Sequence, residues 1–109
     1  MLKKNHSIRK QTEIKEVFKL GKTYKNKSLL LKVKDNKLNK YRMTVVVSSK
    51  VLPKAVNRNK IKRQIKAFFI EELKNNHYQK DFIFVALPEI KELNTQDLKL
   101  IVKKLISAV

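Results

Sequence analysis

The positive charge of this chain is concentrated in its first 66 residues. That segment holds 21 Lys and Arg residues against three acidic ones and so carries the whole net charge of +18, whereas residues 67–109 hold six of each and sum to zero. Such a field opposes a compact fold through self-repulsion, and phosphate groups that neutralise it with release of counterions offset this cost. The pattern therefore predicts a fold that presents a strongly basic surface to a polyanion, and the polyanion we expect is a nucleic acid.

Length and composition predict one small domain that spans residues 1–109. An apolar content of 42% is enough for a two-layer core, and the absence of cysteine excludes disulfides and thiolate–metal sites. No segment approaches the roughly 18 apolar residues of a membrane span. We therefore expect a cytoplasmic protein with no membrane partner.

The first element predicted along the chain is a short amphipathic helix that starts near Gln11. Ile14, Val17 and Phe18 follow the i, i+3, i+4 spacing of one helix face, and Thr12 is a candidate cap. Gly21 is the only glycine of the chain and stands where a left-handed residue would close the helix.

Three later segments are typical of strands. Residues 28–33 and 41–48 flank a polar turn at residues 34–40. The run Val45–Val47 predicts a strand covered on both faces, with a buried helix as the alternative that periodicity alone leaves open. Residues 81–87 form a further buried-strand candidate that Pro88 ends.

A basic helix is predicted between these strands, over residues 54–74. Its apolar residues Ile61, Ile65, Phe68 and Phe69 lie along one side. Another side carries two neighbouring rows with a spacing of four, which we name the basic ridge: Arg58, Asn59, Lys62, Arg63 and Lys66. Like charges at this spacing cost about 0.2–0.5 kcal/mol per pair, which favours a docked anion over the alternative of a merely solvated face.

The last predicted helix follows Thr95, its candidate cap. Leu98, Ile101, Val102 and Leu105 build one apolar stripe, which we assign to the core rather than to a partner groove.

No group of side chains in the sequence predicts unaided hydrolysis. His6 and His77 lack metal-ligand spacing, and the acidic pairs Glu13/Glu16 and Glu71/Glu72 are typical of helix ends or solvent-facing positions. One glycine excludes a glycine-rich phosphate loop. What remains is binding, in which Phe18 and Tyr24 are candidates to stack on bases, although composition alone favours core burial for Phe18.

Residues 48–63, SSKVLPKAVNRNKIKR, closely resemble the signature of the bacterial ribonuclease P protein subunit, and the RNxxKR part is its most specific element. The resemblance spans nearly the whole chain. It includes residues 2–4 (LKK), 8–10 (IRK), 17–21 (VFKLG) and 81–86 (DFIFVA).

This resemblance implies a two-layer α+β sandwich similar to a ribosomal-protein domain, with the element order α-β-β-β-α-β-α. A central mixed sheet of about four strands would contain a left-handed βαβ crossover, against the general right-handed rule. The implied activity is removal of the 5′ leader of precursor tRNA. The catalyst would be the ribonuclease P RNA, with Mg²⁺ bound mainly by that RNA and the substrate. The protein would be the accessory subunit of this endoribonuclease, with no catalytic side chain and no protein partner required.

The resemblance also implies two groups of contact residues. The basic side chains and Asn59 would contact the RNA: Arg9, Lys50, Lys54, Arg58, Asn59, Lys62, Arg63 and Lys66. A cleft between the first helix and the sheet would hold the single-stranded leader, with contacts from Ile14, Phe18, Lys32 and Ser48.

The chain departs from the family pattern at four places. Ile14 and Lys32 stand where aromatic residues are common, so leader stacking is expected to be weaker. Pro53 follows Leu52 in a turn that usually contains glycine, and Leu87 replaces a common Arg, so contacts at these points do not carry over. The alternative function is a ribosomal-type structural RNA-binding protein or RNA chaperone, which charge and size permit equally well.

Overall fold

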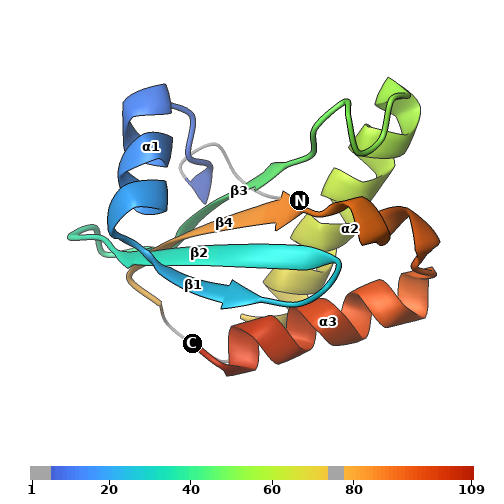
Figure 1. The fold of residues 1–109 in the computed structure, drawn as a ribbon. Coiled ribbons are helices and arrows are strands. Elements are labelled where there is room, and N and C mark those ends of the chain that lie inside the picture. Colours follow the sequence, from blue (N-terminus) through green and yellow to red (C-terminus); the bar gives the residue numbers. More distant parts are fainter. Residues whose placement is uncertain (1–5, 74–77) are drawn as a thin grey trace.

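The computed structural model describes residues 6–73 and 78–109, which form one mixed sheet with helices on both faces (Figure 1). Residues 2–4 of the family resemblance and His77 lie outside this part. The elements in chain order are α1 (Gln11–Leu20), β1 (Lys22–Lys25), β2 (Leu29–Asp35), β3 (Arg42–Val46), α2 (Ala55–Glu72), β4 (Lys80–Ala86), the 3-10 helix η2 (Pro88–Glu92) and α3 (Thr95–Ser107). The predicted order α-β-β-β-α-β-α is therefore confirmed.

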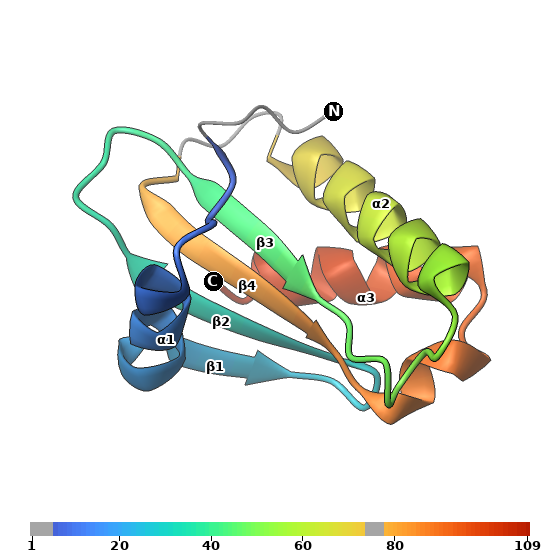
Figure 2. The ribbon, with the colours of Figure 1, turned by 90° about the horizontal axis from the view of Figure 1, so that it is seen from above.

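The sheet has the strand order β1-β2-β4-β3. Its β1–β2 and β2–β4 pairs are antiparallel, and β3 and β4 are parallel neighbours joined through α2. Figure 2 views the sheet from the face that carries α1, and the parallel strands β3 and β4 both point to the lower right. For an observer who looks along this strand direction, β4 lies to the right of β3. Because α2 packs on the opposite face, this connection is left-handed, as the family resemblance implied.

The main core lies between the sheet and the helices α2 and α3. Phe69 of α2 meets Phe82 and Phe84 of β4 edge to face, with ring centroids 4.9 and 5.7 Å apart, and all three side chains are fully buried. Leu98 and Val102 of α3 complete the same cluster. The stripe predicted on the last helix is therefore core.

On the other face of the sheet, which we call the open face, the one helix of the described residues is α1, and Ile8 in the segment before it packs there as well (Figures 1 and 2). A second, smaller cluster joins Val17 of α1 to Ile8 and Ile83. Most side chains on the open face therefore lie outside the main core.

Strand prediction was wrong in two details. The strand β1 was implied by the family resemblance but not located by the residue pattern, because it is a four-residue edge strand whose residues are mostly exposed and show no apolar alternation. Val45 and Val47 are buried, but Val46 is 37% exposed because it points to the open face, where no helix covers β3. The strand is thus covered on one face rather than both.

Gly21 ends α1, but not in the left-handed conformation that was predicted. Its φ of −75° and ψ of 157° are extended. A Cβ at this position would lie 2.5 Å from the carbonyl oxygen of Val17 and 2.9 Å from that of Val33. Glycine is therefore required by the close approach of the helix end to β2 and not by its own torsion angles.

Two predicted helix caps were also wrong. The helix α1 begins at Gln11 with no side-chain cap, and Thr12 lies inside its first turn. Asn94 caps α3, with its Oδ1 accepting a hydrogen bond of 2.8 Å from the Asp97 amide, and Thr95 is the first helical residue. Sequence patterns place helix ends only to within a residue or two.

Candidate nucleic-acid interface

Strand register arranges the open face into three rows that cross β2, β4 and β3. Residues opposite each other in the ladders share a face, so each row runs across three strands. The first row is apolar, the second mixed and the third fully charged: Leu30–Val85–Val46, Lys32–Ile83–Thr44 and Lys34–Asp81–Arg42.

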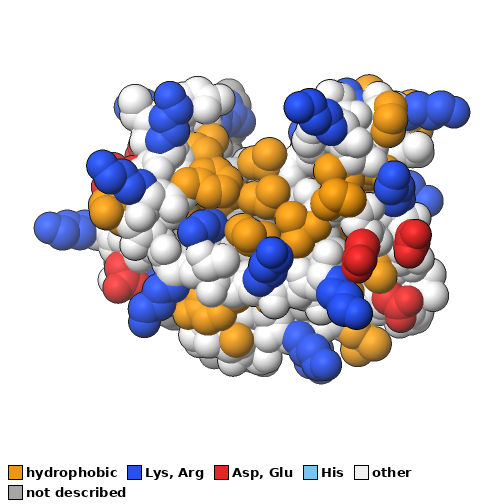
Figure 3. All heavy atoms as spheres, viewed as in Figure 1, with side chains coloured by type: hydrophobic (Ala, Val, Ile, Leu, Met, Phe, Trp, Pro, Cys, Tyr) orange, Lys and Arg blue, Asp and Glu red, His pale blue; other side chains and the backbone are white. Residues whose placement is uncertain are grey.

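The helix α1 lies over the second row, with Val17 packed on Ile83. Ile14 and Phe18 are four residues apart and therefore share one flank of the helix. Figure 3 shows a hollow lined with hydrophobic side chains between α1 and the beginning of α2. We name this hollow the cleft. Its wall is α1 and its floor is the apolar row together with Lys32 of the second row, so its residues are Ile14, Phe18, Leu30, Lys32, Val46 and Val85.

Three of the four predicted leader-binding residues come together at the cleft. Ile14 and Lys32 are half-buried there, and Phe18 is 37% exposed rather than in the core. Ser48 lies two residues beyond β3, and its Oγ accepts a hydrogen bond of 3.0 Å from the Lys50 amide. It therefore shapes the loop at the end of the strand.

The basic ridge occupies the side of α2 that faces away from α3. The opposite side is the one that meets α3, through a 3.2 Å hydrogen bond from Gln64 to Thr95 and a 3.6 Å ion pair between Lys99 and Glu71. Asn59 and Arg63 of the ridge are exposed, and the Lys residues beside them are half-buried. Within residues 6–73 and 78–109, no carboxylate lies within ion-pair distance of a ridge cation.

Arg58 differs from the rest of the ridge. Its Nη1 donates hydrogen bonds to the carbonyl oxygens of Leu52 and Pro53, at 2.9 and 2.7 Å. The guanidinium therefore ties the preceding loop to the first turn of α2. Sequence spacing placed Arg58 correctly on the ridge but could not show that its side chain has backbone partners.

The remaining predicted RNA contacts lie on both sides of the cleft. Lys50 and Lys54 are exposed in the loop that leads into α2, and Lys54 is the residue before its first turn. Arg9 is exposed just before α1, next to Ile8, whose amide donates to the carbonyl of Met43 in β3. The structure thus places Arg9 on the α1 side and the lysines on the α2 side.

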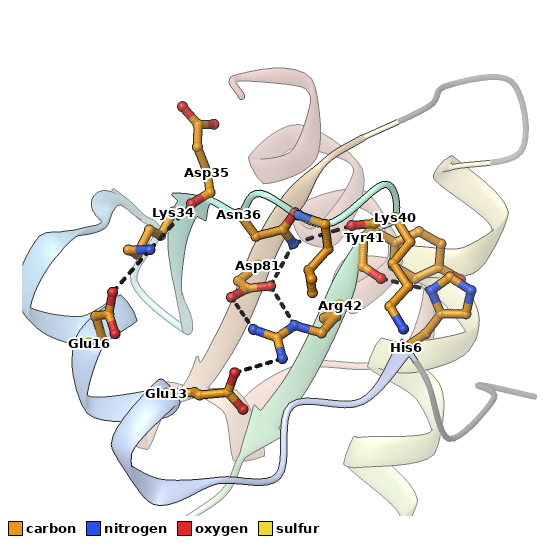
Figure 4. Close-up of polar contacts among 11 residues, drawn as sticks. His6, Glu13, Glu16, Lys34, Asp35, Asn36, Lys40, Tyr41, Arg42 and Asp81 are labelled. Atoms are coloured by element: carbon orange, nitrogen blue, oxygen red, sulfur yellow. Dashed lines mark hydrogen bonds and ion pairs between the residues drawn. The ribbon is translucent and has the colours of Figure 1, made fainter.

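The charged row forms an ionic cluster with two acids of α1 (Figure 4). Arg42 binds Asp81 through two hydrogen bonds, of 2.9 and 2.7 Å, and donates a third of 2.9 Å to Glu13. Lys34 pairs with Glu16 at 3.3 Å, and Asn36 donates to Asp81 at 2.8 Å. The ionic cluster therefore consists of Glu13, Glu16, Lys34, Arg42 and Asp81.

The ionic cluster adds to the sequence-based interpretation of Glu13 and Glu16 as charges at a helix end or a solvent-facing position. Glu13 lies in the first turn of α1 and Glu16 is exposed, as expected, but both also form ion pairs. Their partners lie on the sheet, and no local spacing signals them. The hydrogen bond to Asp81, followed by the one to Glu13, raises the pKa of the Arg42 guanidinium above its ordinary value, against the opposing effect of burial. Arg42 therefore stays charged and binds the carboxylates of Asp81 and Glu13.

Residues 6–73 and 78–109 contain no group of three or more His, Cys, Asp or Glu side chains placed to hold a metal ion. None of the helices in the same part of the chain is long and apolar enough to cross a membrane.

Comparison with known proteins gives consistent matches. A family model described as Ribonuclease P matches residues 2–109. A ribonuclease P protein component from Clostridium botulinum (strain 657) is 40% identical over 97 residues, which covers 88% of this chain and 86% of that protein. Another from Geobacillus sp. (strain WCH70) is 33% identical over 98 residues, covering 90% and 84%.

Solved structures agree with these matches. The RNase P protein of Staphylococcus aureus superposes with a TM-score of 0.87 at 26% identity, covering 94% of both chains. A mutant of that protein with defective mRNA degradation activity gives a TM-score of 0.88 at 26% identity, covering 96% of this chain and 88% of that one. The RNase P protein of Thermotoga maritima shares the fold, with a TM-score of 0.75 at 21% identity, covering 90% and 96%.

Proposed function

This chain belongs to the ribonuclease P protein family, and from that premise we propose that it binds the catalytic RNA of ribonuclease P through α2 and the 5′ leader of precursor tRNA in the cleft. The observation that carries the proposal is the position of the basic ridge beside a cleft that is apolar and open. Ridge cations without carboxylate partners suit phosphates, whereas an apolar floor with an exposed aromatic ring suits unpaired bases.

The protein's contribution in this proposal is binding rather than bond cleavage. Positive charge on both sides of the cleft lowers the repulsion between two RNA molecules, and so reduces the Mg²⁺ needed for their association. We assign Mg²⁺ to the RNA subunit and the substrate. The acids nearest the cleft do not fit a metal site, because Glu13, Glu16 and Asp81 each pair with Lys or Arg.

The test is cleavage of labelled precursor tRNA at low Mg²⁺ by the protein alone, a bacterial ribonuclease P RNA alone, and the two together. We expect cleavage at the mature 5′ end only in the mixture. Cleavage by the protein alone, on this substrate or on an unstructured mRNA, would assign catalysis to the protein. An absence of stimulation with a folded RNA control would favour a general RNA chaperone, whose affinity varies little among RNAs and falls steeply with salt.

Removal of Arg63 tests the basic ridge. We expect Arg63→Ala to weaken binding to the RNA subunit by about 1–3 kcal/mol, since charge-assisted hydrogen bonds to phosphate are lost, and to leave stability unchanged because Arg63 is exposed. Titration of labelled RNA and urea unfolding measure the two quantities. Arg58→Ala is the informative comparison: it should lower both affinity and stability, because Arg58 also holds the loop before α2. Unchanged affinity in Arg63→Ala would remove the ridge from the interface.

Removal of Phe18 tests the cleft. We expect Phe18→Ala to weaken precursor binding by about 1–3 kcal/mol, the contribution of one stacked base, and only for substrates with a leader long enough to reach it. Affinity measured over a series of leader lengths gives the result. The matched control is Leu20→Ala, which removes a side chain that is 62% exposed near the end of the same helix. Equal losses on leaderless tRNA would show that Phe18 acts through packing alone.

A further inference from the structure

The helix α1 is held on the open face by few apolar contacts. Val17 is its only buried residue, and the cluster beneath it is small. By contrast, α2 and α3 share the large core on the other face. A helix of 10 residues with one buried side chain needs other interactions to keep its position.

The ionic cluster supplies these interactions at one side of α1. Glu13 reaches Arg42 on β3 and Glu16 reaches Lys34 on β2, so the helix is tied to two strands (Figure 4). Arg42 itself is fixed by its two hydrogen bonds to Asp81, a side chain that is only 4% exposed. The Arg42 side chain is therefore a fixed partner for Glu13 of α1.

The acids and the cleft residues occupy opposite flanks of α1. With 100° per residue, Glu13 and Glu16 lie on one side of Val17, and Ile14 and Phe18 lie on the other. A rotation or tilt of the helix about Val17 therefore moves the acids and Phe18 together. A change in the ion pairs Glu13–Arg42 and Glu16–Lys34 would therefore also change the width of the cleft.

We propose that the ionic cluster sets the position of α1 and thereby the width of the cleft, and that Glu13 and Arg42 are positioning residues for the leader. The inference rests on the proposed function, in which the leader lies in the cleft. The ionic cluster touches no RNA in this arrangement and acts through the wall that carries Phe18.

The direction of the change in leader affinity on removal of Glu13 separates the positioning role from a simple change in net charge. Removal of an acid from α1 makes the protein more positive, which by itself strengthens binding to any RNA. The positioning role predicts the opposite for the leader. Glu13→Ala should lower the affinity gained from the leader by at least about fivefold, the lower limit for one stacked base, while affinity for leaderless tRNA holds or rises.

Two variants complete the binding experiment. Glu71→Ala removes the same charge from the Lys99–Glu71 pair between α2 and α3, away from the cleft, and should leave the leader-length dependence unchanged. Glu13→Gln keeps an oxygen that can accept the bond from Arg42 and should restore part of the leader effect. An unchanged leader effect in Glu13→Ala, or an equal loss in Glu71→Ala, would overturn the inference.

A distance measurement tests the position of α1 without RNA. The chain has no cysteine, so Lys15→Cys on α1 and Lys103→Cys on α3, both exposed, can carry a pair of spin labels. We expect Glu13→Ala to broaden or shift the distance distribution, and Glu71→Ala to leave it unchanged. An identical distribution in Glu13→Ala would overturn the positioning role.

The two experiments also separate this inference from the proposed function. If the parent protein shows no leader-dependent affinity, the proposed leader site is wrong, whatever the spin labels report. If the parent protein shows it and Glu13→Ala keeps it, the leader site stands and the positioning role is wrong.

Discussion

Replacement of Phe69 by alanine is expected to lower the free energy of unfolding by about 3–5 kcal/mol, the range for a large aromatic side chain removed from a core. Phe69 is fully buried and touches the rings of Tyr41, Phe82 and Phe84 edge to face, at centroid distances of 5.6, 4.9 and 5.7 Å. Together with Ile65, which is also fully buried, Phe69 packs α2 on the sheet. Since small domains are stable by about 5–15 kcal/mol, and self-repulsion of +18 charges opposes this chain's fold, the loss is a large fraction of the total.

Phe68→Ala is the matched control for this prediction. Phe68 is the adjacent residue, is only half-buried and packs at the edge of the same cluster. Urea unfolding followed by circular dichroism should therefore show a clearly smaller loss. Similar losses in the free energy of unfolding for the two variants would contradict the burial of Phe69 and the partial exposure of Phe68.

The second large effect is expected from Asp81→Ala, which should cost about 3–5 kcal/mol of stability. The change leaves the Arg42 guanidinium, whose side chain is 15% exposed, without the carboxylate that accepts two of its hydrogen bonds. Asn36 loses a partner as well. Arg42 keeps its hydrogen bond to Glu13, but a buried charge that loses two of its three hydrogen bonds is expensive because water does not replace them.

A double variant shows whether the cost comes from the stranded charge. Asp81→Ala with Arg42→Met removes both charges and fills part of the space with an apolar side chain, which is often close to neutral for buried pairs. Urea unfolding should therefore show the double variant to be more stable than Asp81→Ala alone. A double variant as unstable as the single one would place the cost in lost packing instead.

The helices were largely predictable because their signals are local. The spacing of Ile65 and Phe69 identified the buried side of α2, and the spacing of Lys62 and Lys66 identified a row of the basic ridge on another side. Both follow from 3.6 residues per turn, which needs no knowledge of the rest of the chain. The helix ends were less certain, as Asn94 in place of Thr95 shows.

Strand environment was less predictable because it depends on what covers each face. Val46 has the same side chain as its buried neighbours Val45 and Val47, yet it is 37% exposed. The difference arises because α1 covers only part of the open face. Phe18, which composition favoured for the core, is exposed at the same opening for the same reason.

The sequence by itself determined the family, the order of the elements and the basic ridge, because a contiguous motif and helical periodicity are local properties. The family resemblance also implied a cleft beside the first helix, but only the tertiary structure decided which strand residues form its floor and which residues form the ionic cluster. Arg42 meets Glu13 and Asp81 from 29 and 39 residues away, and Asn36 meets Asp81 from 45. Such contacts depend on strand register and on the position of α1 on the sheet, and a shift of one residue in register would turn Arg42 or Asp81 to the other face.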